Sequence, residues 1–276
     1  MRVTVLVEDY SGYESPFLAQ HGVSFLIEKN GRRVLFDTGQ SAYPVLHNMG
    51  LLGIKPESID YVFLSHCHYD HTGGLLDILK VAGKRVPLIA HPTIFRRHFV
   101  MGPSLRDVGI PFRREEVEKL AELYLTVEPI EIVNGLYSTG EIGDREDFER
   151  AGIGVYTLKK GKIVEDLLLD DMSIVVKTEE GLVVVSGCSH AGIVGIVKHA
   201  IRLTGKDRVK AVIGGFHLID AGEERIKRTV EEFKRLGVEE VYTGHCTGLK
   251  AEAEFMEAYG ERFHKLHSGM IMEFRG

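Results

Sequence analysis

Residues 65–74 read Ser-His-Cys-His-Tyr-Asp-His-Thr-Gly-Gly, with three histidines and an aspartate within six positions. It directly follows a short apolar run that is typical of a buried strand. His66 and His68 are two residues apart, so in extended backbone they project from the same face. Asp70 and His71 come after the backbone bends. Imidazole and carboxylate groups bind zinc and similar ions at about 2.0–2.2 Å, and two pairs of ligands displaced by a turn suit two ions about 3.5–4 Å apart.

The spacing His66-x-His68-x-Asp70-His71 resembles the metal signature of the metallo-β-lactamase superfamily. A closer resemblance is to the branch of proteins called dihydropterin-6-methyl-ribofuranosylaminobenzene-phosphate synthase-like. Three further segments resemble the same branch: residues 34–41, 187–193 and 244–248. The resemblance implies an α+β protein with the four-layer αββα sandwich, in which the metals lie at one edge of the two sheets. No composition shift marks a boundary, so we expect one domain over residues 1–276.

Further ligands are expected where two later strands end. The apolar runs 182–186 and 238–242 lead to His190 and His245, as the first strand leads to its histidines. The superfamily pattern has a bridging aspartate at a strand end, and Cys188 stands where we expect it. We therefore predict His190 and His245 as metal ligands and Cys188 as a thiolate ligand, with Asp171 as the alternative to Cys188.

Three other residues are candidates for supporting roles. Asp37, in Asp-Thr-Gly, is either a turn-former or a carboxylate that orients a metal-bound histidine. It is not an aspartic-protease residue, because no second Asp-Thr-Gly or Asp-Ser-Gly occurs in the sequence. His91 and His217 each follow a predicted strand, so we assign both to substrate binding, with a ligand role still open for His217. Cys67 alternates with the two histidines and should face the core.

The rest of the chain predicts alternating strands and helices. An Asn-Gly turn between residues 23–28 and 33–36 indicates a hairpin. Thr72 is a plausible N-cap for a helix over residues 74–82. Residues 113–124 have apolar positions on one side of a helix. The arginines of residues 96–114 form either a solvated face or a lid that attracts a phosphate or carboxylate. The other expected strands are 2–7, 60–64, 86–90, 129–133, 136–139, 153–159, 163–169, 173–178, 210–213 and 270–274; the other expected helices are 42–51, 192–203, 223–236 and 249–259.

Composition narrows the class of protein. The chain has 276 residues, 44% of them hydrophobic, which is enough for a sizeable core. Its net charge of −6 gives no support for nucleic-acid binding. No apolar run approaches the roughly 20 residues that span a bilayer. Three cysteines and an early acidic pair, Glu8-Asp9, argue against a disulfide framework and a signal peptide. We expect a soluble, cytoplasmic protein whose partner is a small molecule.

These features predict a metallohydrolase with one or two zinc ions, manganese or iron being alternatives. The substrate is expected to be small and anionic, with a phosphate, and to be attacked by a metal-activated water that Asp70 helps to align. The resemblance implies an alternative, a pterin-condensing synthase that releases diphosphate. Two further alternatives are an iron-dependent redox enzyme of the same fold and a metal-binding protein without turnover.

Overall fold

The computed structural model describes residues 1–143, 145–149 and 154–276, and two seven-stranded sheets form its centre. The first sheet has the order β18-β1-β2-β3-β4-β5-β8. In that order its strands are Ile271–Glu273, Arg2–Val7, Ser24–Lys29, Arg32–Phe36, Tyr61–Phe63, Val86–Ala90 and Ala121–Leu125. The second sheet has the order β17-β16-β15-β14-β13-β10-β9. Its strands are Phe263–Lys265, Glu240–Thr243, Val209–Gly214, Gly181–Val185, Ile174–Thr178, Leu136–Ser138 and Glu131–Val133.

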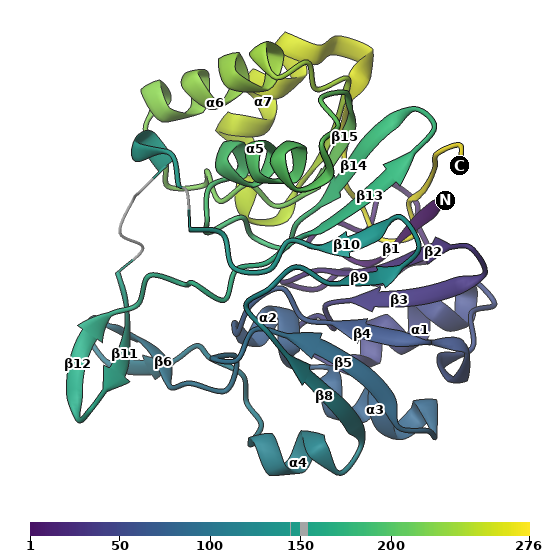
Figure 1. Ribbon diagram of the computed structural model, residues 1–276, viewed down its shortest axis with the longest axis vertical. Helices are drawn as coiled ribbons and strands as arrows, with labels where there is room; N and C mark the ends of the chain where they lie inside the picture. Colours follow the sequence, from purple (N-terminus) through teal and green to yellow (C-terminus); the bar gives the residue numbers. More distant parts are fainter. Residues whose placement is uncertain (144, 150–153) are drawn as a thin grey trace.

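Helices cover the outer faces of both sheets, so the molecule has four layers in the order α, β, β, α (Figure 1). The first sheet is covered by α1 (Ala42–Leu51) and α3 (Leu75–Ala82), with α2 (Tyr69–Thr72) and α4 (Arg114–Glu118) as short turns at its edges. The second sheet is covered by α5 (Ile193–Thr204), α6 (Glu223–Arg235) and α7 (Leu249–Tyr259). Four short 3₁₀ turns complete the described helices: Pro56–Ser58, Asp147–Glu149, His245–Thr247 and Gly260–Arg262. The predicted α+β, four-layer αββα sandwich is confirmed.

The layers follow from strands that are apolar on both faces. Successive side chains of a strand point to opposite faces. Val34 and Phe36 of β3 therefore pack between the two sheets, whereas Leu35 packs under the helices of the first sheet. In β14, Val183 lies between the sheets and Val184 packs against the helices of the second sheet. Continuous apolar strands of this kind need cover on both sides, and the two helical layers provide it.

A third, smaller sheet projects from one end of the sandwich (Figure 1). Its order is β12-β11-β6-β7, and its strands are Lys162–Glu165, Val155–Lys159, His98–Met101 and Leu105–Asp107. The predicted strand 153–159 is found as β11, with residue 153 outside the described residues, and the predicted strand 163–169 is found as β12, which ends already at Glu165. Both lie here in one sheet with two strands from the arginine-rich segment. Those two strands were not predicted.

Two local predictions were wrong. The predicted helix 113–124 ends at Glu118, because residues 121–125 form β8 and pair with β5 in the first sheet. Thr72 is not an N-cap: it is the last residue of α2, and its hydroxyl donates to the carbonyl oxygen of His68 at 2.9 Å.

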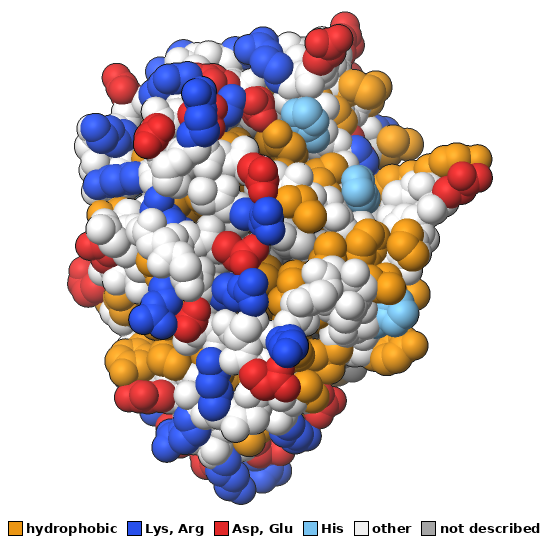
Figure 2. Space-filling model, turned by 90° about the vertical axis from the view of Figure 1, so that its right-hand side faces the viewer, with side chains coloured by type: hydrophobic (Ala, Val, Ile, Leu, Met, Phe, Trp, Pro, Cys, Tyr) orange, Lys and Arg blue, Asp and Glu red, His pale blue; other side chains and the backbone are white. Residues whose placement is uncertain are grey.

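The surface carries charges of both signs. On the face in Figure 2, lysine and arginine side chains alternate with aspartate and glutamate, and hydrophobic side chains gather toward one edge. This face therefore offers no continuous basic surface among the described residues. Within the same residues, no helix is both long enough and apolar enough to cross a membrane.

Candidate metal centre

The predicted ligands meet at one edge of the sandwich, where strands of both sheets end. β3, β4 and β5 are parallel to one another, and so are β14, β15 and β16, so the loops that follow each set emerge at one edge. The histidines of residues 66–71 come from the first sheet. Cys188, His190 and His245 come from the second. The site therefore lies between two parts of the chain that are more than 100 residues apart.

Cluster one consists of His66, His68 and His190, whose ring nitrogens lie within 4.8 Å of one another. Nε2 of His66 is 3.0 Å from Nδ1 of His68, and Nε2 of His190 is 3.2 Å from the same atom. As predicted, His66 and His68 face the same way. Cys67, between them, is fully buried in the core under the helices of the first sheet, which confirms its expected direction.

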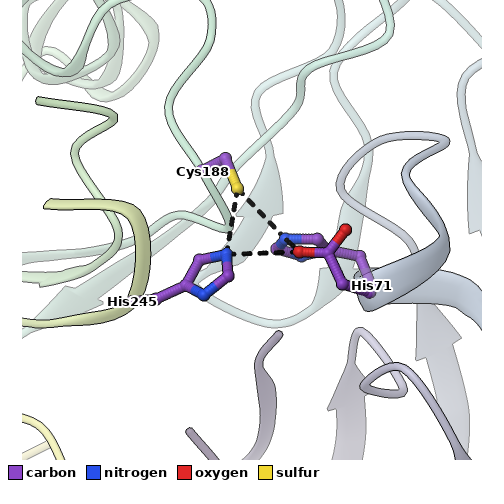
Figure 3. Close-up of side chains that lie close together, drawn as sticks. His71, Cys188 and His245 are labelled. Carbon is purple, nitrogen blue, oxygen red and sulfur yellow. Dashed lines mark hydrogen bonds and ion pairs between the residues drawn. The ribbon is translucent and has the colours of Figure 1, made fainter. Parts of the chain in front are cut away.

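Cluster two consists of Asp70, His71, Cys188 and His245, which also lie within 4.8 Å of one another (Figure 3). Sγ of Cys188 is 3.1 Å from Nε2 of His71 and 3.3 Å from Nε2 of His245. An oxygen of Asp70 is 3.4 Å from each of these nitrogens. A tetrahedral site with bonds of about 2.0–2.3 Å has edges of about 3.3–3.8 Å, so the four atoms have nearly the spacing of a zinc site.

Asp37 orients histidines in both clusters. One of its oxygens accepts hydrogen bonds from Nδ1 of His71 at 2.7 Å and from the Ser65 hydroxyl at 2.6 Å. The Ser65 oxygen lies 2.9 Å from Nδ1 of His66. Protons on both Nδ1 atoms leave the Nε2 lone pairs of His66 and His71 directed into the clusters. This is the contact that the predicted orienting role of Asp37 requires.

His68 and His245 are held by residues that the sequence did not single out. Nε2 of His68 is 2.8 Å from Nε2 of His98, whose Nδ1 is 2.8 Å from Asp166. A proton on Nδ1 of His98 makes its Nε2 the acceptor, so His68 donates through Nε2 and directs the Nδ1 lone pair into cluster one. Nδ1 of His245 is 2.9 Å from Asp9.

The unpaired nitrogens support cation binding. In cluster one, the lone pairs of His66 and His68 face each other at 3.0 Å without a proton between them. Such an arrangement is repulsive unless a cation lies between the atoms. The Nδ1 atom of His217, a residue beside Cys188 and His190, is buried and has no hydrogen-bond partner within the described part of the chain. Imidazole, thiolate and carboxylate are also the donor types that zinc prefers, so the residues fit such an ion.

Burial and charge set the protonation of these groups. Burial, together with the neighbouring histidines, holds the pKa of His66 well below its usual value, so the ring is neutral as a ligand must be. Burial lowers the pKa of His71 as well, but Asp70 and Asp37 outweigh it and raise this pKa to about 9, so without an ion the Nε2 of His71 carries a proton that a bound cation would displace. Burial and neighbouring groups, including the Cys246 thiol, raise the pKa of Cys188 well above its usual value, so a bound cation is what would favour its thiolate.

The other sequence candidates fall in different places. His217 lies within 4.8 Å of Cys188 and His190, so it borders both clusters. The structure does not bring His91 to this site: it is buried, and its ring bonds to Thr93 and Glu141 at 2.8 and 3.0 Å. It follows β5, whose end is enclosed by those side chains.

Asp171 lies in neither cluster. One of its oxygens accepts a hydrogen bond from the backbone N–H of Ala191 at 2.8 Å. It supports the loop that carries His190. The sequence left Cys188 and Asp171 as alternatives for one ligand position, and of the two it is Cys188 that lies in cluster two.

Backbone strain is concentrated at the site. Asp37, Ser189, His217 and His245 all have φ between 47° and 62°, a region that residues other than glycine rarely adopt. Gly187 permits a close approach between the halves, since a Cβ there would lie 2.5 Å from the Ser65 hydroxyl. Conformations of this cost persist only where the surrounding contacts enforce them.

A pocket of about 530 Å³ opens over the two clusters. Its floor includes His68, Asp70, Cys188 and His245. Its walls come from residues 217–221, from Arg225 at the start of α6 and from the small sheet. This volume is in the range of sites for small molecules.

Comparisons with known proteins agree with this geometry. The family model described as metallo-beta-lactamase superfamily matches residues 19–245. A 7,8-dihydropterin-6-methyl-4-(β-D-ribofuranosyl)-aminobenzene-5′-phosphate synthase of Methanocaldococcus jannaschii is 48% identical over 99% of this chain and 97% of its own length.

Among solved structures, a metal-dependent hydrolase of the β-lactamase superfamily matches with a TM-score of 0.86 and 30% identity, with both chains covered completely. A diphosphatase of the PhnP family has a TM-score of 0.53 and 15% identity, with 99% of this chain and 98% of its own covered, which shows a shared fold alone.

Proposed function

Because the chain belongs to the metallo-β-lactamase superfamily, we propose that it is a metal-dependent enzyme whose substrate is small and carries a phosphate. The observation that carries this proposal is the pair of clusters on the floor of an open pocket, with the ring nitrogens of His66 and His68 facing each other in cluster one. Groups of this kind bind a cation and leave room above it for a substrate. The resemblance noted in the sequence and the 48% identical synthase support the same view.

Cluster one would hold one ion through His66, His68 and His190, and cluster two a second through Asp70, His71, Cys188 and His245. When bound, such ions polarise a phosphoryl oxygen and lower the pKa of a coordinated water. Asp70 is the residue that we assign to aligning the attacking group, and His217 borders both clusters on the substrate side. The mixed nitrogen, sulfur and oxygen donors favour zinc over manganese or iron.

The synthase reaction is the first candidate, because the archaeal relative is nearly half identical over almost the full length of both chains. Its name describes a dihydropterin-6-methyl group joined to ribofuranosylaminobenzene 5′-phosphate. We infer that this chain joins the same two halves, with diphosphate leaving from the pterin half. Hydrolysis is the second candidate, favoured by the 30% identity and complete overlap with a metal-dependent hydrolase.

One experiment separates the candidates. The purified protein is incubated with the diphosphate of 6-hydroxymethyl-7,8-dihydropterin, with and without ribofuranosylaminobenzene 5′-phosphate, and released diphosphate is measured. A synthase releases diphosphate only with the acceptor, whereas a hydrolase releases phosphate or diphosphate equally without it. We expect the first result.

Substitutions test the role of the clusters in that reaction. We expect Asp70→Asn to lower the rate at least about 100-fold, because a carboxylate that aligns reacting groups is lost. Asp77→Asn, an exposed residue of α3 outside the pocket, is the matched control and should keep full activity. Full metal content without turnover of the pterin pair or of simple phosphate esters would contradict an enzymatic role, and bound iron would favour the redox alternative.

A further inference from the structure

Arg225 is a half-buried arginine in the wall of the pocket, and its side chain forms no hydrogen bond or ion pair within the part of the chain that the structure describes. It lies in the first turn of α6, just after the loop that carries His217. Its Nε is buried and has no hydrogen-bond partner among the described residues. Burial lowers the pKa of Arg225, and the charge of Glu149 opposes this only in part. A buried donor on a cation is costly unless an anion satisfies it.

None of the nearby carboxylates forms an ion pair with Arg225, and two of them, Glu149 and Asp9, bond to other groups. Both oxygens of Glu149 accept from backbone N–H groups of α5, those of Val194 and Gly195, at 2.9 Å each. Asp9 at the pocket wall pairs with His21 and His245. Asp220, in the same wall as Arg225, is exposed and forms no ion pair with it.

A second arginine enters the pocket from a different element. Arg106 of β7 lines the wall that the small sheet provides and is exposed, and its side chain forms no hydrogen bond or ion pair with any residue in the described ranges. Its neighbour on the same strand differs, because Asp107 pairs with Arg97 at 3.0 Å. The pocket therefore has two unpaired guanidinium groups on its walls and metal-binding groups on its floor.

We propose that Arg225, together with Arg106, forms a subsite that binds a phosphate group of the substrate. This inference rests on the proposed function and deepens it, because it assigns specificity for a phosphate to residues outside the metal clusters. A guanidinium presents several N–H donors in a plane and binds phosphate oxygens through paired hydrogen bonds. Two such groups from separate elements suit a tetrahedral dianion better than a planar carboxylate. The phosphate would give the Arg225 guanidinium the anionic partner that it lacks among the described residues.

The test is a calorimetric titration of the full-length, metal-containing protein with phenyl phosphate, benzoate and phenol. We expect phenyl phosphate to bind most tightly, and Arg225→Gln to weaken it about 10- to 100-fold, as for loss of charged hydrogen bonds. Arg225→Lys should be intermediate, because it keeps the charge but loses the paired donors. Arg106→Gln should also weaken binding, and as an exposed residue of β7 it gives a variant independent of the folding of α6.

Lys227→Gln is the matched control, since it removes one positive charge from the exposed side of the same helix, outside the pocket. It should bind phenyl phosphate as the unmodified protein does. Affinity for phenyl phosphate within twofold in both arginine variants would overturn the proposal, because the anion would then be held by the metals alone. An equal dependence of benzoate binding on Arg225 would overturn the assignment to phosphate.

Metal content is measured on every sample. A protein that takes up no metal even when zinc is supplied would contradict the proposed function. If its affinity for phenyl phosphate still depended on Arg225, the subsite would be supported. A protein with full metal content whose phenyl phosphate affinity depends on neither arginine would contradict the subsite and leave the proposed function supported.

Discussion

At the scale of single residues, Cys188 is the feature that most distinguishes the site. Its Sγ lies in cluster two and is also within 4.8 Å of the ring nitrogens of His190 and His217. A thiolate there is softer than the aspartate expected from the superfamily pattern, which shifts metal preference toward zinc. It also gives the site an optical signature that a carboxylate lacks.

If Cys188 is a thiolate ligand as proposed, we predict that cobalt-substituted protein shows an intense thiolate-to-metal absorption band in the near ultraviolet. Cys188→Ser should lose the band and bind less metal in cluster two. Absorption spectra with metal analysis of the same samples provide the measurement.

Cys67→Ala is the control for that experiment, since Cys67 is buried in the core under α1 and α3. It should keep the band and the metal content of the unmodified protein. A band that survives in Cys188→Ser would mean that another thiol binds, and the position of Cys246 in the pocket wall makes it the first to test.

The residues predicted from sequence are those whose spacing repeats a strand-end pattern. His66, His68, Asp70 and His71 form such a pattern by themselves, and their meeting in two clusters agrees with it. His98 was missed because its role depends on pairing between residues 98–101 and 155–157, which no local spacing reveals. Asp9 gave a weak signal, an acid just after a strand, but nothing linked it to His245 far along the chain.

At the scale of elements, the small sheet is tied to the site by a buried ion pair. Arg96, just before β6, contacts Asp166 at 2.5 Å and Asp170 at 2.7 Å, and the three side chains are mostly buried. Asp166 also contacts His98, and Asp170 accepts from the backbone N–H of Cys67 at 2.9 Å. Arg96 is thus a structural member of the arginine-rich segment, neither solvated nor part of a lid.

We predict that Arg96→Met lowers the free energy of unfolding by about 3–5 kcal/mol, because it leaves two buried carboxylates without a cation. Arg97→Met, next to it, removes an exposed pair with Asp107 and should cost less than about 1 kcal/mol. Urea denaturation of the two variants measures the difference. Equal losses would show that Arg96 contributes no more than a surface charge.

The same pair implies a pH dependence. Burial alone would raise the pKa of Asp166, but His98 and Arg96 hold it well below its usual range. A carboxylate with a lowered pKa in the folded state stabilises that state above the unfolded pKa of about 3.9, and the stabilisation is lost as pH falls further. The gap between the unmodified protein and Arg96→Met should therefore shrink below about pH 4.

The helix predicted over residues 113–124 is too long because strand pairing outweighs the helical spacing of its last residues. Val117, Leu120, Ala121 and Tyr124 have helical spacing, but Ala121, Leu123 and Leu125 also alternate as in a strand. The sheet decides between the two, because β5 would otherwise present an open edge and residues 121–125 pair with it. Local sequence carries no information about that edge.

At the scale of the whole molecule, the two clusters of candidate metal ligands join the two sheets. The ligands of each cluster come from residues 66–71 on one side and 188–245 on the other. The order of layers was predictable, since the motifs that lead to the family span most of the chain. Binding that requires the folded arrangement stabilises it, and the stabilisation grows with metal concentration.

We predict that removal of metal by a chelator lowers the melting temperature by about 5–10 °C, as expected for loss of a ligand at 100 times its dissociation constant. Differential scanning calorimetry before and after chelation, and after zinc is restored, is the measurement. A variant with one ligand removed from each cluster, His66→Ala/His71→Ala, should respond much less. An unchanged melting temperature after complete removal of the metal would contradict a link between the sheets.

The small sheet is formed by two excursions of the chain, one between β5 and β8 and the other between β10 and β13. It supplies Val100, Arg106 and Val155 to the pocket, while the floor is made by the ends of the main strands. Mutations in the small sheet can therefore change the pocket wall while the floor stays the same. Over evolutionary time, mutations in these two segments could change which compound is accepted without disturbing the strand ends that carry the candidate metal ligands. Relatives with identical floors and divergent excursions would then be expected to serve different metabolic roles.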